Sequence, residues 1–171
     1  MFLPDVLAGR AVAVAGPAGP LAEAVADAAG RAGAAVALCG QDTESLDELA
    51  WDLAERRDSP VDIVAWDGAD PGAALRDALA AAGRGDAALV LLGGAGWGAV
   101  AAAAWQGAGP VVVIAPDDEV PLEPGSATVL VAPASAAVDR LAAWAVFLLS
   151  PTGAVAGGQI IRINDTSGAI Y

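Results

Sequence analysis

The sequence predicts a three-layer α/β fold, in which a doubly wound parallel sheet of about seven strands carries helices on both faces. Short apolar runs with the length of strands alternate along the whole chain with longer alanine-rich segments with the length of helices. The early runs are continuously apolar, which is typical of strands that are buried on both faces of a parallel sheet. We find no internal repeat and no linker in the 171 residues, and therefore expect a single domain over 1–171.

Seven apolar runs are expected to form the strands: Val12–Ala15, Ala34–Cys39, Val61–Ala65, Ala88–Leu92, Val111–Ala115, Ala127–Ala132 and Gln159–Ile163. The helices are expected between them: Leu21–Ala32, a segment from Asp42 or Ser45 to about Arg57, Pro71–Gly83, a short helix over Ala99–Gln106, and Ser135–Leu149. Ser45 and Glu48 have the spacing of a capping box. Pro71 and Gly83 bracket their helix in the usual order. Asp117–Ser126 is rich in proline and acidic residues and is expected to be a solvated loop.

The charge of the chain excludes several classes of partner. It has 21 acidic residues, eight arginines, no lysine and no histidine, which gives a net charge of −13. Nucleic acid and anionic lipid surfaces both require clustered basic residues, so neither is an expected partner. The hydrophobic fraction of 56% is partly alanine, but a surplus beyond one core would favour a buried subunit interface.

The location of the chain is expected to be cytoplasmic. The first residues carry Asp5 and lack the basic start of a secretory signal. Residues 87–115 are uncharged, but their glycines divide them into strand, turn and short helix, so we do not expect a membrane span. The single cysteine, Cys39, follows an apolar run and is expected to be a small buried side chain.

Two glycine-rich turns are candidate ligand sites. Gly16–Leu21 follows the first strand, where dinucleotide-binding folds place the pyrophosphate, but Pro17 and Pro20 each remove an amide donor. A plain strand-to-helix turn remains the alternative. The second, Gly93–Ala101, contains the pattern G-x-G-x-x-A. In a doubly wound sheet these turns face each other, so a ligand would lie between Gly16–Leu21 and Gly93–Trp97.

The order of these segments resembles the short-chain dehydrogenase/reductase (SDR) family over nearly the whole chain. Leu7–Gly16 is similar to the opening strand of that family, and Gly16 and Gly19 fall on its TGxxxGxG turn. Asp67 matches the acidic residue after the third strand, which contacts adenine, and Gly93–Gly96 stands where the family has NNAG. The end of the chain is similar to the closing segment of the family: Phe147–Pro151 and Gly157–Asp165. The resemblance implies a Rossmann-like, NAD(P)-binding fold. It also implies a vestigial cofactor site: Gly16, Gly19, Leu21, Asp67, Gly93, Gly94, Ala95 and Gly96.

The chain differs from the family at the positions that bind the cofactor and at those that carry out catalysis. Pro20 and Ala22 replace glycines of the turn, and Gly93 and Gly94 replace both asparagines. The strand that ends in the catalytic serine of the family ends here in Ala115-Pro116-Asp117, and the Tyr-x-x-x-Lys helix is missing. The fourth and fifth helix region is therefore shortened. The only tyrosine, Tyr171, lies beyond the last strand, with no lysine to lower its pKa.

In the SDR family, the fourth and fifth helices form one subunit interface, and the last helix and last strand form the other. The resemblance implies that this chain retains the second interface. On the helix Ser135–Leu149, one stripe is apolar: Ala137, Leu141, Trp144, Ala145 and Leu148. Packing against the sheet explains part of this stripe, and the remainder favours a dimer contact together with the strand Gln159–Ile163. Trp51 and Trp66 are expected to fill the core. Trp97 follows the second glycine turn, and two alternatives stay open for it: a core side chain, or one that caps or plugs the ligand crevice.

Two hypotheses follow. The first is a catalytically inactive SDR-like subunit, structural or regulatory, that pairs with itself or with an active SDR paralogue and needs no cofactor. The second is a nucleotide- or small-molecule-binding protein that retains a weak NAD(P) site. It would be a sensor, or an enzyme that uses the carboxylates of Asp67, Asp117 and Asp118.

Overall fold

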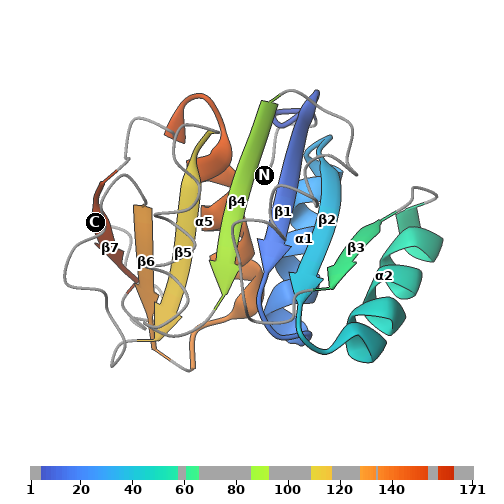
Figure 1. The fold of residues 1–171 in the computed structure, drawn as a ribbon. Helices are drawn as coiled ribbons and strands as arrows, with labels where there is room; N and C mark the ends of the chain where they lie inside the picture. The colour runs from blue at the N-terminus through green and yellow to red at the C-terminus, as the bar shows by residue number, and fades with distance from the viewer. Residues whose placement is uncertain are drawn as a thin grey trace.

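The sheet is parallel throughout and has seven strands in the order β3-β2-β1-β4-β5-β6-β7 (Figure 1). A computed structural model describes residues 5–57, 61–65, 86–92, 109–116, 128–133, 135–153 and 158–163. The strands are β1 (Arg10–Ala15), β2 (Ala35–Gly40), β3 (Asp62–Ala65), β4 (Asp86–Leu92), β5 (Val111–Pro116), β6 (Thr128–Ala132) and β7 (Ile160–Arg162). The described helices are α1 (Pro20–Arg31), α2 (Thr43–Arg57) and α5 (Val138–Leu149). The predicted doubly wound parallel sheet is therefore confirmed.

The direction of the chain through the sheet reverses at β1 and β4, which are neighbours although residues 16–85 separate them. From β1 the chain runs outward through β2 to β3, and from β4 it runs outward in the other direction to β7. The predicted helices over Pro71–Gly83 and Ala99–Gln106, the loop Asp117–Ser126 and Trp66 lie outside the described residues.

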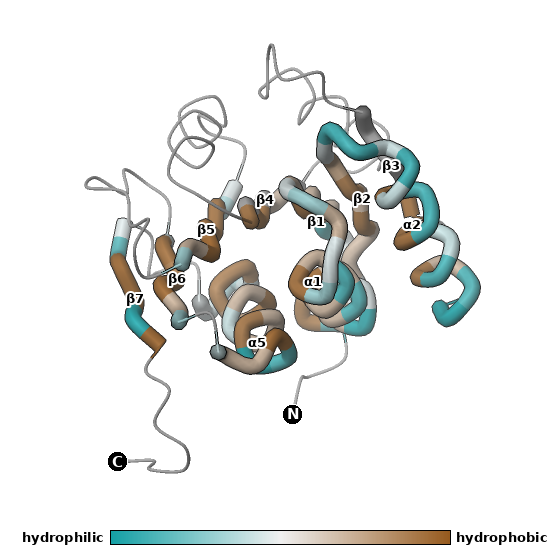
Figure 2. The backbone as a smooth tube through the Cα atoms, turned by 90° about the horizontal axis from the view of Figure 1, so that it is seen from below, coloured by the Kyte–Doolittle hydropathy of each residue, from teal (hydrophilic) through white to brown (hydrophobic). Residues whose placement is uncertain are grey.

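The three described helices lie on one face of the sheet, and their apolar sides meet the strands (Figure 2). On β1, Val12 and Val14 belong to the core beneath these helices, whereas Ala11, Ala13 and Ala15 alternate with them and are also buried. Burial on both faces explains why the strands are continuously hydrophobic. Within the described ranges, no helix is long and apolar enough to cross a bilayer.

The start of α2 differs from the expected capping box. The backbone N–H of Ser45 donates to Asp42 Oδ1 at 3.2 Å, and its hydroxyl donates to Asp42 Oδ2 at 2.7 Å. Asp42 thus caps the helix, which begins at Thr43, and Ser45 lies inside the first turn. These hydrogen bonds, and one from the backbone of Glu44, lower the pKa of the Asp42 carboxyl.

The expectation that Trp51 fills the core is wrong, since its side chain is 72% exposed. The residues of α2 that face the sheet are Leu46, Ala50 and Leu53, at helical spacing. Trp51 follows Ala50 in the sequence, but one step along a helix turns its side chain away from the sheet. The side of α2 that faces away from the sheet is largely hydrophilic (Figure 2).

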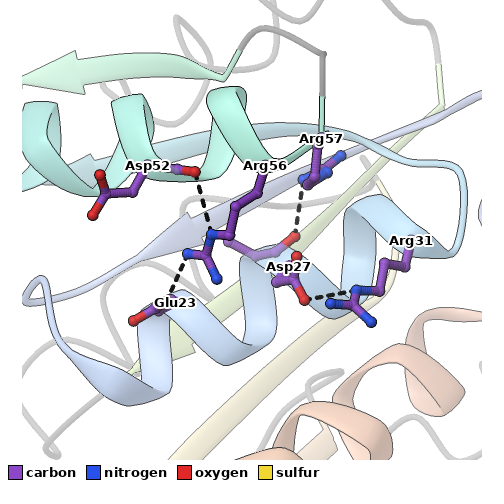
Figure 3. A network of polar contacts seen from close by, with 7 residues as sticks. Glu23, Asp27, Arg31, Asp52, Arg56 and Arg57 are labelled. Carbon is purple, nitrogen blue, oxygen red and sulfur yellow. Dashed lines mark hydrogen bonds and ion pairs between the residues drawn. The ribbon is translucent and has the colours of Figure 1, made fainter.

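Polar contacts join α1 to α2 (Figure 3). The Arg56 guanidinium donates to Glu23 Oε1 at 2.6 Å, and that of Arg57 donates to the carbonyl of Ala26 at 3.3 Å. Gly30 makes room for Arg57, because a Cβ at position 30 would overlap the guanidinium. The ion pair is exposed and adds little stability, so these contacts mainly orient the two helices.

The first strand is also tied to the last described helix. The Arg10 guanidinium donates to the carbonyl of Leu149, the last residue of α5. A cation at a helix C-terminus satisfies an otherwise free carbonyl and interacts favourably with the helix dipole. Along the rest of its length α5 packs against α1, with Leu141, Ala145 and Leu148 buried.

Candidate ligand-binding site

The turn between β1 and α1 forms the first part of the candidate site. Gly16 has φ 151°, and its N–H donates to the carbonyl of Cys39 at 3.0 Å. A Cβ at Gly16 would lie 2.7 Å from the carbonyl oxygen of Leu92 and 2.8 Å from its Cβ. Glycine is therefore required here so that the turn can approach the end of β4.

Gly19 has a different environment from Gly16. Apart from its neighbours in the chain, no atom of the described residues lies within 4 Å of the position that a Cβ at Gly19 would take, and its φ of 168° is ordinary extended backbone. Pro20 then begins α1, and no side chain caps this helix. Gly16 is thus explained by packing, whereas Gly19 faces open space.

The contact between Gly16 and Leu92 brings together the ends of β1 and β4. Ala15 pairs with Leu91 in the sheet, so the two strands end at the same level. The second glycine-rich turn follows β4 in the sequence but lies outside the described residues, so its place opposite the first turn stays a prediction. The predicted site residues Asp67, Gly93, Gly94, Ala95 and Gly96 lie outside the described residues, as do Trp97, Asp117, Asp118 and Tyr171.

A cavity of about 340 Å³ lies at the carboxyl edge of the sheet, between α1, α5 and the ends of β5 and β6. Each lining residue that the structure describes is Ala, Val, Leu, Ile or Pro. Pro20 and Leu21 come from α1, Pro116 and Pro133 from the ends of β5 and β6, and Val138 and Leu141 from the first turn of α5. This is the edge at which open α/β sheets bind their ligands.

The sequence indicates only part of this cavity. Leu21 was expected to contact a ligand, and Ala115 and Pro116 were noted only because a catalytic serine is missing there. The wall formed by Ala132, Pro133 and the start of α5 was not predicted. The available signal was a proline directly after an apolar strand, in Ala115-Pro116 and again in Ala132-Pro133.

The described residues do not form a metal site. Among them there is no cluster of three Cys, Asp or Glu side chains that could hold a metal ion. Cys39 is buried as expected, and burial raises the pKa of its thiol to about 11, so it is protonated at neutral pH.

The connection between β5 and β6 is short. These strands pair in parallel, from Val112 with Thr128 to Pro116 with Ala132, and only residues 117–127 join them. A parallel crossover usually takes a dozen or more residues and contains a helix. The sequence of this segment contains neither a tyrosine nor a lysine.

Comparison with known proteins relates this geometry to one group of solved structures. The citronellol catabolism dehydrogenase of Pseudomonas aeruginosa PAO1 superposes with a TM-score of 0.73 at 18% identity, over 97% of this chain and 98% of that chain. A short-chain dehydrogenase from Mycobacterium smegmatis gives 0.72 at 17% identity, over 98% and 97%. L-Sorbose reductase from Gluconobacter frateurii, complexed with NADPH and L-sorbose, gives 0.65 at 17% identity, over 94% and 97%.

The sequence itself carries a weaker signal than the structure. No protein-family model matches the chain, and no curated protein matches it. At 13–18% identity, the solved neighbours establish the fold and not the activity. The sheet order, the glycine turn after β1 and the superpositions lead to one conclusion: this chain has the fold of the short-chain dehydrogenases/reductases.

Proposed function

We propose that this chain is a catalytically inactive SDR-like subunit that pairs with itself or with an active SDR paralogue, in a structural or regulatory role. The observation that carries the proposal is the segment 117–127, which joins β5 to β6 directly. The proton donor of the family resembled by this chain is a tyrosine activated by a lysine. This chain has no lysine and no histidine, and its one tyrosine is the last residue.

The surface proposed for pairing is the outer side of α5 together with β7, the described helix and edge strand that lie towards the same end of the sheet (Figure 2). Phe147 is 46% exposed and meets Trp144 edge to face, with ring centroids 6.0 Å apart. With Ala143, these rings line a hollow of about 290 Å³. On β7, Ile160 is 41% exposed. Exposed aromatic side chains are typical interface anchors, and β7 is the last strand of the described sheet on that side.

The structure divides the predicted apolar stripe of α5 into two parts. Leu141, Ala145 and Leu148 are buried inside the subunit, against α1 and the sheet, and are not available to a partner. Trp144 is only partly buried, and Phe147, beside the stripe, is exposed. The pairing proposal therefore rests on Trp144 and Phe147 with Ile160.

Two experiments test the proposal. The purified chain, assayed alone with NADH and NADPH and a panel of aldehydes and ketones, is expected to oxidise neither cofactor; turnover would refute the inactive role. In sedimentation velocity, the wild type and Trp51→Glu are expected to be dimers and Phe147→Glu a monomer. Trp51 is the matched control because it is an exposed aromatic on α2, away from α5.

If the wild type is a monomer on its own, pairing with itself is refuted. The paralogue form is then tested by co-expression with a full-length SDR encoded next to this chain. Co-purification that is lost in Phe147→Glu and kept in Trp51→Glu supports it, and failure to co-purify refutes it.

A second candidate is a nucleotide- or small-molecule-binding protein with a weak NAD(P) site. The solved neighbours from Burkholderia cenocepacia and Gluconobacter frateurii were crystallised with NADP and NADPH. The open space at Gly19 and the cavity beside Leu21 favour a ligand at this edge. The described part of the turn fits a dinucleotide poorly, however, since Pro17 and Pro20 lack the N–H groups that a pyrophosphate needs.

Direct titration with NAD, NADH, NADP and NADPH tests this candidate. Binding that is weakened in Gly19→Val would support it, because that side chain would enter the open space without disturbing the packing at Gly16. Absence of binding for all four would refute the nucleotide form and leave the small-molecule form.

A further inference from the structure

We propose that the cavity between α1, α5 and the carboxyl ends of β5 and β6 binds an uncharged, apolar small molecule of one or two rings. This inference deepens the second candidate function, ligand binding at the carboxyl edge, and does not depend on subunit pairing. Its basis is the chemistry of the lining, the position of three prolines, and the size of the space.

The part of the lining that the structure describes offers a ligand no polar side chain. Each described residue that lines the cavity is Ala, Val, Leu, Ile or Pro, with no hydroxyl, amide, carboxylate or guanidinium among them. Most small-molecule pockets combine an apolar lining with a few polar groups that fix orientation. A ligand with its own polar groups would lose their hydrogen bonds to water here without replacement, which is costly.

The backbone also lacks N–H donors at three positions that line the cavity. Pro116 ends β5, Pro133 follows β6 and Pro20 begins α1, and a proline has no N–H. At the carboxyl edge of a parallel sheet, the amides at these positions are those that ordinarily donate to phosphates, carboxylates and carboxamides. Three of the segments that surround the cavity therefore each lack a donor where one would be used.

Charge argues in the same direction. The chain has a net charge of −13, and four of its eight arginines interact elsewhere in the fold. Arg10 binds the end of α5, Arg31 pairs with Asp27, and Arg56 and Arg57 bind α1. None of the described lining residues is basic; Arg140, between the lining residues Val138 and Leu141 on α5, is exposed and does not line the cavity.

The size of the space limits the ligand. A volume of about 340 Å³ is at the lower end of the range of roughly 300–1,000 Å³ for small-molecule pockets. It accommodates a bicyclic hydrocarbon skeleton or a ring with a short alkyl chain. Burial of such a skeleton against Leu21, Val138 and Leu141 supplies favourable free energy in proportion to the apolar area removed from water.

The test uses two fluorescent probes that differ only in charge. Naphthalene is neutral and bicyclic, and naphthalene-1-sulfonate carries the same two rings with a sulfonate. In titrations of the full chain, the neutral probe is expected to bind at one saturable site, and the sulfonate at least about tenfold more weakly. Equal or tighter binding of the sulfonate would overturn the proposal.

Two variants locate the bound probe. Ala136→Phe places a large side chain into the cavity wall and is expected to weaken binding of the neutral probe at least about tenfold. Phe147→Glu alters the other apolar hollow, on the outer side of α5, and is expected to leave binding unchanged. Loss of binding in Phe147→Glu with retention in Ala136→Phe would overturn the proposal.

Val138→Phe is a second cavity-filling variant in case Ala136→Phe does not fold, as judged by circular dichroism. If neither folds, the two probes and Phe147→Glu still decide the question. Absence of binding by the neutral probe overturns the proposal, including the case in which another part of the chain or a second copy fills the cavity. If NADPH binds although the neutral probe does not, the proposed ligand class is wrong and the second candidate function stands. If neither the neutral probe nor NADPH binds, this proposal and the second candidate function both fail.

Discussion

Replacement of Gly16 by alanine tests whether the first turn is built for packing. The added Cβ would meet the Leu92 carbonyl oxygen at 2.7 Å and the Leu92 Cβ at 2.8 Å, closer than real Cβ contacts. The oxygen is backbone at the end of a central strand, so it cannot move away cheaply. The φ of 151° adds strain for any residue with a side chain.

The two effects give the magnitude. Backbone strain of this kind costs about 1–3 kcal/mol, and overpacking costs a further 1–3 kcal/mol or so. Gly16→Ala is therefore expected to lower the free energy of unfolding by about 2–6 kcal/mol, a large part of the roughly 5–15 kcal/mol that a domain possesses.

The matched control is Gly19→Ala, in the same turn. The new Cβ meets nothing within 4 Å, and the backbone is ordinary extended chain. We expect a change within about 1 kcal/mol, in either direction. Urea unfolding followed by far-ultraviolet circular dichroism measures both variants. If Gly16→Ala is as stable as Gly19→Ala, the packing explanation of Gly16 is refuted.

Three further predictions concern the described helices and Cys39. Leu53→Ala is expected to cost about 2–5 kcal/mol in urea unfolding because Leu53 is fully buried, and Trp51→Ala less than about 0.5 kcal/mol because Trp51 is exposed; similar losses would contradict the assignment of the two faces of α2. Iodoacetamide at pH 8 is expected to leave Cys39 unmodified in the folded chain and to alkylate it after denaturation. Because the folded pKa is raised from 9.0 to about 11, the thiol contributes stability below pH 9 that is lost as the pH rises towards 11, and Cys39→Ala should lack this loss. Asp42→Ala is expected to lower the thermal midpoint at pH 7, and the difference from wild type should vanish as the pH falls through the lowered pKa of Asp42, where its carboxylate is protonated; a difference that persists in acid would argue against the cap.

The strands were predictable from the sequence because burial on both faces leaves a continuous apolar run, and their observed bounds lie within two residues of those expected. The first residue of a helix is harder to predict, because neighbouring residues can compete to cap it. Both Asp42 and Ser45 can cap a helix, and only the structure shows that Asp42 accepts the hydrogen bonds from Ser45. The prediction that Trp51 fills the core was wrong because it rested on hydrophobicity alone. The position of Trp51 around the axis of α2 points it away from the buried side formed by Leu46, Ala50 and Leu53.

The candidate site was less predictable than the fold. The glycine turn after β1 was identified, but its two glycines have different roles that depend on the distance to Leu92. The cavity is formed by residues that are far apart in the chain, from Pro20 to Leu141. No local pattern describes such a space, because it arises from the way α1 and α5 pack at the ends of β5 and β6.

The packing of α1 against α5 also constrains how the polypeptide can acquire its structure during synthesis. The strand β1 is central in the sheet and pairs with β4, while α1 packs against α5, which is synthesised after the other described helices. Until Leu141–Leu149 has left the exit tunnel, the apolar side of α1, which includes Val25 and Ala29, stays exposed in the nascent chain. Native contacts of such long sequence separation favour slow, post-translational completion of folding and a period in which chaperones are needed.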